Sequence, residues 1–172
     1  MKSLKLTLSV FMLVAFASVN TFAQEEATVT ATAEIQAALT ISADQNIDLG
    51  TIQTGTSSTL AAGPDDGTTE VNVGTSTSYG IVRMTGTASG TVTLSFSDAI
   101  LTQSGSDPLD FVTVGYDSAS QASHTSGSTL NFDASGNLTL YLGGTLDAAA
   151  GSGTYSTSGG GTASPITVTI QY

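Results

Sequence analysis

Alternation of apolar and polar side chains is the main pattern of the chain from residue 27 onward. In residues 27–41, ATVTATAEIQAALTI, most even positions carry Thr, Glu or Gln, and the odd positions carry Val29, Ala31, Ala33, Ile35, Ala37, Leu39 and Ile41. A period of two is that of a β-strand, because successive side chains point to opposite faces. The stretch therefore predicts one strand with an apolar face, longer than the usual ~5–6 residues.

Shorter alternating segments recur along the rest of the chain. TVTLSF, residues 91–96, places Val92, Leu94 and Phe96 on one face, and NLTLYL, residues 137–142, does the same with three leucines. No stretch sustains the 3.6-residue spacing of an amphipathic helix, and Gly-, Pro- and Asp-containing turns separate the segments. The pattern predicts an all-β sandwich. Its strands are expected at residues 28–41, 47–53, 69–74, 79–85, 91–97, 110–116, 129–133, 137–142 and 165–172.

The first 23 residues have the features of a cleaved secretory signal peptide. Lys2 and Lys5 precede an apolar run from Leu6 to Ala17, and small residues stand at Thr21 and Ala23 before Gln24. The run is shorter than the roughly 20 residues that cross a bilayer as a helix, and no later segment is long and apolar enough to do so. Residues 1–23 are thus expected to be a signal peptide, and no transmembrane segment is predicted.

The mature chain is expected to be one acidic domain without cysteine. Removal of 23 of the 172 residues leaves 149. Arg83 is then the one basic residue besides His124, against fourteen Asp and Glu, so the formal net charge is −13. A single domain of this size buries enough surface to fold without a disulfide. The negative charge would repel nucleic acid, so no nucleic-acid partner is expected.

Catalytic chemistry finds little support in the sequence. His124, the single histidine, lies in the polar segment QASHTSGS. A catalytic triad would need an activated serine beside it, and no G-x-S-x-G motif is present. The sequence therefore predicts no catalytic residue, and the protein is not expected to be an enzyme.

Metal and cofactor sites find equally little support. One His without Cys cannot form a zinc or copper centre. Residues 133–144 offer Asp133, Ser135 and Asn137 at the spacing of a calcium loop, but Leu138 and Gly144 stand where an EF-hand needs Gly and Glu. A hairpin turn explains these residues better. No metal, no cofactor and no cofactor-binding residue are predicted.

Motifs near both ends of the chain resemble a known family. They are ATVTATAEIQAALTISADQNIDLGTI, LYLGGTL, GTYS and the closing ITVTIQY. These motifs resemble the bacterial secreted family catalogued as domain of unknown function 4402, which is similar to the spore coat protein U-like pilins of archaic chaperone-usher pili. The chain departs from the pattern at Ile47-Asp48-Leu49-Gly50, where Leu-Asp-Phe-Gly is usual, and in lacking the cysteine pair common in those pilins.

The resemblance implies an immunoglobulin-like antiparallel β-sandwich that is secreted through the periplasm to the extracellular space or cell surface. It also implies partners: copies of the chain or related subunits, a periplasmic chaperone and an outer-membrane usher. Residues 24–36 would be an N-terminal extension, with residues 37–172 forming the sandwich. In pilin domains such an extension donates a strand to the next subunit, here through Val29, Ala31, Ala33 and Ile35.

Both the role of the opening segment and the function of the protein have an alternative. The opening segment is either a donated strand or the first strand of a self-complete sandwich, with a bend near Ala37-Ala38. The expected function is that of a non-enzymatic structural subunit of a surface fibre, pilus-like or fimbria-like, or of an extracellular matrix, assembled by strand addition. The alternative is a monomeric secreted binding module for a glycan, an ion or a protein. Either way, the last strand is expected to present one apolar face, formed by Ile166, Val168, Ile170 and Tyr172.

Overall fold

The computed structural model describes residues 30–117 and 119–172. The predicted signal peptide at residues 1–23 and the side chain of Val29 lie outside this part. The chain divides into two units, Met1–Glu34 and Ile35–Tyr172. The described residues of the second unit form ten strands: β1 (Thr40–Gln45), β2 (Ser58–Leu60), β3 (Gly80–Thr85), β4 (Thr91–Phe96), β5 (Ala99–Leu101), β6 (Leu109–Asp117), β7 (Ala122–His124), β8 (Thr129–Asn131), β9 (Asn137–Leu146) and β10 (Val168–Gln171).

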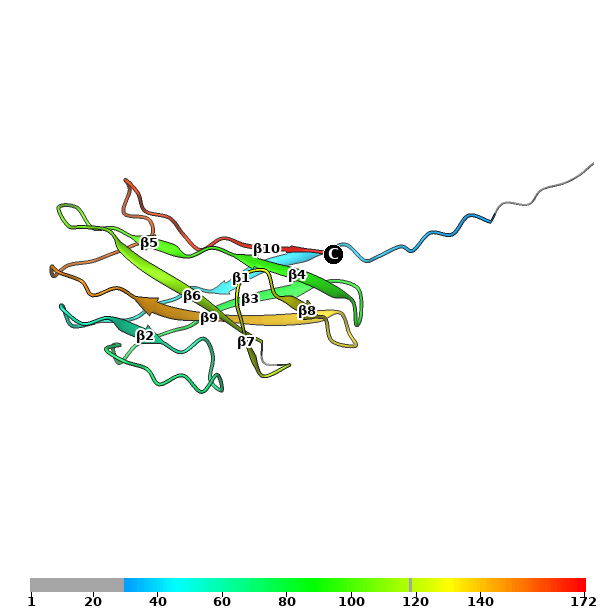
Figure 1. Cartoon of the computed structure of the whole chain (residues 1–172), viewed down its shortest axis with the longest axis horizontal. Coiled ribbons are helices and arrows are strands. Elements are labelled where there is room, and N and C mark those ends of the chain that lie inside the picture. Colours follow the sequence, from blue (N-terminus) through cyan, green and yellow to red (C-terminus); the bar gives the residue numbers. More distant parts are fainter. Residues whose placement is uncertain (1–29, 118) are drawn as a thin grey trace, which may run out of the picture. The chain divides into compact units, whose positions relative to one another are not determined.

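The strands form two antiparallel sheets, so the prediction of an all-β sandwich is confirmed. The larger sheet has the order β1-β3-β9-β6-β5, with β2 also paired to β9 and β7 to β6. The smaller sheet has the order β10-β4-β8. In Figure 1, β10 ends at the carboxyl terminus, and the chain enters β1 close to the same point. No helix that could span a membrane occurs in residues 30–117 or 119–172.

The main core lies between the inner faces of the two sheets. Alternation in β9 directs Leu138, Leu140 and Leu142 inward, and Leu140 is fully buried. From the smaller sheet, Val92 and Leu94 of β4 pack into the same cluster. The alternation seen in the sequence thus marks the two strands that hold the sheets together.

Six predicted strands are confirmed, with shifted ends, as β3, β4, β6, β8, β9 and β10. Three short strands, β2, β5 and β7, were not predicted, and β9 continues to Leu146. The turn predicted after β8 is present, but β8 and β9 belong to different sheets, so the expected hairpin is wrong.

The strands predicted at 47–53 and 69–74 are wrong. Only Asp48 and Val71 of these segments take part in pairing, each in an isolated bridge. Gly50 and Asn72 have left-handed backbones, with φ of 68° and 48°, and such a conformation interrupts an extended strand. The Asn72 side chain also donates to the carbonyl oxygens of Gln53 and Thr56, which fixes the two segments as interlocked loops.

The strand predicted at residues 28–41 is wrong for its described part before Thr40. Residues 30–39 belong to no strand, and only Thr40 and Ile41 fall within β1. Alternation gave a correct inward position for Leu39, which is half-buried against the main core. A strand needs a neighbouring strand to bond with, and residues 30–39 have none among the residues that the structure describes.

The Gly143-Gly144 pair in β9 has a packing reason. A Cβ on Gly143 would overlap the backbone of Ala61, and one on Gly144 would overlap the carbonyl oxygen of Val112. Gly144 also has a φ of 151°, which L-residues rarely adopt. The lack of a side chain at these two positions lets the backbones of Ala61 and Val112 approach β9 closely.

Candidate functional site

A groove lies between β1 of the larger sheet and β10 of the smaller sheet. Each is the last strand of its sheet, so within the described residues one edge of each has no strand beside it. The groove has a volume of about 620 Å³. Its apolar lining includes Ile41, Ile47, Val82, Leu142, Ile166 and Val168.

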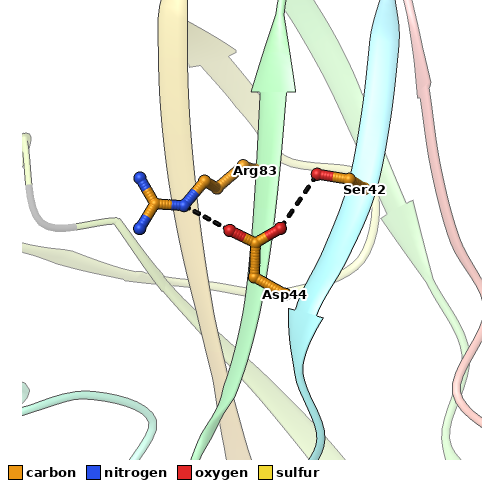
Figure 2. A network of polar contacts seen from close by, with 3 residues as sticks. All are labelled: Ser42, Asp44 and Arg83. Atoms are coloured by element: carbon orange, nitrogen blue, oxygen red, sulfur yellow. Dashed lines mark hydrogen bonds and ion pairs between the residues drawn. The ribbon is translucent and has the colours of Figure 1, made fainter.

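Polar side chains on the outer face hold β1 in register with β3. Thr40 Oγ1 lies 2.6 Å from Thr85 Oγ1. Further along, Arg83 donates through Nε to the Asp44 carboxylate, which also accepts from Ser42 Oγ at 3.0 Å (Figure 2). The ion pair is exposed and contributes at most about 1 kcal/mol. Its effect is to fix the position of β1, which is the first wall of the groove.

The inner face of β1 is a core face without a cover. Ile41 pairs with Met84 and Ala43 with Val82, and both partners are buried in the core. Paired residues of an antiparallel ladder share a face, so Ile41 and Ala43 also point to the core side. Yet Ile41 is 45% exposed, and every residue of β1 is exposed. Side chains that face the core and remain open to water leave room for another segment.

A bulge interrupts β1 at Asp44. The register with β3 shifts between Ala43 and Gln45, so Asp44 is an extra residue without an opposite partner. Such a bulge twists an edge strand and ends regular pairing. The regular part of this wall therefore runs from Thr40 to Ala43.

The second wall of the groove is β10 with the residues around it. Ile166, Val168 and Ile170 are half-buried and pack against the main core, as expected from their alternation. Tyr172 differs from the expectation of one apolar face, because it is 43% exposed and its hydroxyl is hydrogen-bonded. The strand is held to β4 on one side only.

The residues predicted to donate a strand are exposed where they are described. Ala31 and Ala33 are exposed, Ile35 is 92% exposed, and none of the three belongs to a strand. Val29 lies outside the described residues. The apolar side of this segment thus remains uncovered in a single chain.

The residues around His124 form a capped turn. Asp117 is buried, and its carboxylate accepts hydrogen bonds from the backbone N–H groups of Ala119 and Ser120 at 2.9 and 3.3 Å. Ser120 Oγ lies 3.4 Å from His124 Nε2. Asp117 is therefore engaged by the backbone of this turn, and no hydrogen bond from it to His124 occurs among the described residues.

The candidate calcium residues belong to a turn as well. Asp133 Oδ1 accepts the backbone N–H groups of Ser135 and Asn137, each at 2.8 Å. These bonds, that of Asn137 above all, hold the pKa of Asp133 below its ordinary value. Among the described residues, no three His, Cys, Asp or Glu side chains gather as metal ligands would.

We expect Asp133→Asn to remove part of the acid sensitivity of the fold. A lowered folded-state pKa stabilises the protein above the ordinary carboxyl pKa of about 3.9, and that contribution is lost as pH falls through the folded value. The wild type should therefore melt higher than the variant at neutral pH, with the difference shrinking in acid. Thermal melts across a pH series measure this, with Asp107→Asn, exposed in another turn, as the control for one lost charge. An equal, pH-independent loss in both variants would contradict the assignment.

Sequence reasoning missed part of the groove. Ile41 was seen only as the end of an alternating stretch and Leu142 only as one of three leucines on a shared face. Val82 was placed only within the strand expected at residues 79–85. Pairing of β1 with β3 brings these residues together, and no local sequence pattern indicates which two sheet edges border the same groove. Comparison with models of protein families finds no match for this chain, and comparison with curated proteins finds none either.

Proposed function

We propose that this protein is a non-enzymatic structural subunit of a bacterial surface fibre or extracellular matrix. In this proposal, the N-terminal extension of one copy enters the groove between β1 and β10 of the next. The observation that carries the proposal is the inner face of β1, where Ile41 and Ala43 point to the core side and remain exposed.

Two features make an extended segment the fitting occupant. The groove is bordered by two strand edges, so main-chain hydrogen bonds are available on both sides, and alternate side chains can fill an apolar floor. In a strand conformation the seven residues from Val29 to Ile35 would span about 23 Å, close to the roughly 20 Å of the six-residue β1. The small side chains of Ala31 and Ala33 suit a shallow floor, and Val29 and Ile35 would act as anchors.

The open groove also suggests the need for the proposed periplasmic chaperone. An unpaired strand edge beside exposed apolar side chains pairs readily with other chains. A subunit of this kind therefore needs cover until it is incorporated. Secretion through the periplasm, a chaperone and an outer-membrane usher form one consistent route to the cell surface.

The proposal predicts complementary loss of assembly in two single variants. Ile35→Asp places a charge on the extension, and Ile41→Asp places one in the groove; both side chains are exposed in the single chain, so each monomer should fold. A carboxylate buried at a junction costs several kcal/mol, so neither variant should oligomerise alone. Mixed together, they should form a 1:1 dimer, in which the intact extension of Ile41→Asp fills the intact groove of Ile35→Asp. This dimer cannot grow, because its free extension and its free groove both carry the charge.

Size-exclusion chromatography with light scattering measures these species, using mature wild type and both variants. Gln36→Asp, next to Ile35, and Thr169→Asp, on the exposed side of β10, place the same charge outside the proposed contact. They are the controls and should assemble like wild type. A wild type that stays monomeric at every concentration would favour the alternative of a secreted binding module. If Ile35→Asp fails to fold as a monomer, the opening segment belongs to its own sandwich.

A further inference from the structure

A hydrogen-bonded cluster around Tyr172 holds the chain just before β1. The Tyr172 hydroxyl accepts from the backbone N–H of Thr87 at 2.7 Å and donates to the carbonyl oxygen of Ala37 at 2.9 Å. The N–H of Ala37 donates in turn to Thr87 Oγ1 at 2.8 Å, and this oxygen lies 3.0 Å from the Tyr172 hydroxyl. Both peptide groups of Ala37 are thereby fixed.

The cluster lies at one end of the groove and joins its two walls. β1 begins opposite the end of β3, and Gln171 of β10 lies opposite Thr93 near the start of β4. Residues 86–90 connect β3 to β4 at this end, and Thr87 is one of them. Tyr172 thus links the end of β10 to the chain that enters β1.

A subunit that donates its extension must avoid filling its own groove with it. An attached segment competes at an effective concentration in the millimolar range, far above that of a second subunit. To enter its own groove beside β1, the extension would have to reverse direction within about residues 36–39. This reversal would pull Ala37 out of the cluster, and residues 27–43 contain no Gly, Pro, Asn or Asp to form a tight turn.

We propose that Tyr172 is a positioning residue that keeps the extension out of the groove of its own subunit and leaves it free for a second copy. The inference rests on the proposed function. Thr87 acts with Tyr172, because its hydroxyl oxygen and its backbone N–H complete the cluster.

The test compares the full mature chain with Tyr172→Phe, which keeps the ring and removes the hydroxyl. Refolded at a series of concentrations, the variant should need about tenfold more protein for half of it to oligomerise, as expected for about 1.4 kcal/mol from lost hydrogen bonds. Its monomer should melt higher than that of Ile35→Asp, because the extension now covers the groove. Thr87→Val, which leaves Tyr172 in place, should shift the midpoint the same way.

A synthetic peptide of residues 24–38 separates this inference from the proposed function. It should bind the groove of the Ile35→Asp chain equally well with and without Tyr172→Phe, because that extension competes in neither. Peptide binding with an unshifted oligomer midpoint in both Tyr172→Phe and Thr87→Val would overturn the role of Tyr172 and leave the groove standing. Peptide affinity reduced by Tyr172→Phe would also overturn it, since Tyr172 would then be a wall of the groove. Absence of peptide binding would remove both proposals.

Discussion

Gly144→Ala is expected to destabilise the fold severely. A Cβ at this position would overlap the carbonyl oxygen of Val112 on the paired strand β6, and the φ of 151° is unfavourable for any L-residue. The clash is with backbone in the middle of the larger sheet, so no side chain can rotate away to relieve it. We expect a loss of at least about 3 kcal/mol, a large part of the stability of a small domain.

Denaturation by urea of the purified protein measures this loss, with Gly105→Ala as the matched control. Gly105 also has a positive φ, of 81°, but a Cβ there meets nothing within 4 Å. Only the backbone strain of about 1–2 kcal/mol should appear in the control. Equal losses in the two variants would show that the close approach to Val112 is relieved by a shift of β6.

Deletion of residues 166–172 is expected to leave the chain unfolded. It removes the half-buried side chains of Ile166, Val168 and Ile170 and strips β4 of one neighbour. Full burial of such side chains is worth roughly 1.5–3 kcal/mol each. Even half of this, together with the lost ladder and the newly exposed β4, approaches the whole stability of ~5–15 kcal/mol.

The control for this deletion is the double variant Thr167→Ala and Thr169→Ala. Both side chains are exposed on the opposite face of the same segment, so the change should stay within about 0.5 kcal/mol for each. The yield of soluble protein and the melting temperature are the readouts. A truncated chain that accumulates and melts like the full one would show that β10 is peripheral, and the groove would then lack its second wall.

The strands that could be predicted from sequence are those with one face on the core. β4 alternates over its six residues and β9 over its first six, residues 137–142, and burial of one face is what maintains such a pattern. β2, β5 and β7 have three residues each, too few to show a period. Their pairing depends on the neighbouring strands, which lie far away in the sequence.

The candidate site could be predicted only in part, because alternation does not name the partner of a strand. The apolar positions of residues 27–41 were visible, but the exposure of Ile35 and the late start of β1 depend on tertiary structure. In the cluster around Tyr172, this residue bonds to Thr87, which is 85 positions away in the sequence, and to Ala37, which is 135 positions away. A tyrosine hydroxyl gives no sequence signal of what it will bind at such a distance.

The bulge at Asp44 limits how the chain can aggregate. Cross-β stacking into amyloid requires flat segments of about six or seven residues that pair without interruption. Beside β1, an incoming chain meets a regular edge only from Thr40 to Ala43 before the extra residue displaces the ladder. So short an edge forms few main-chain hydrogen bonds, and these alone bind another chain weakly. A segment that also buries apolar side chains in the groove can still bind. The bulge therefore favours ordered, one-to-one contacts over indiscriminate growth of a sheet.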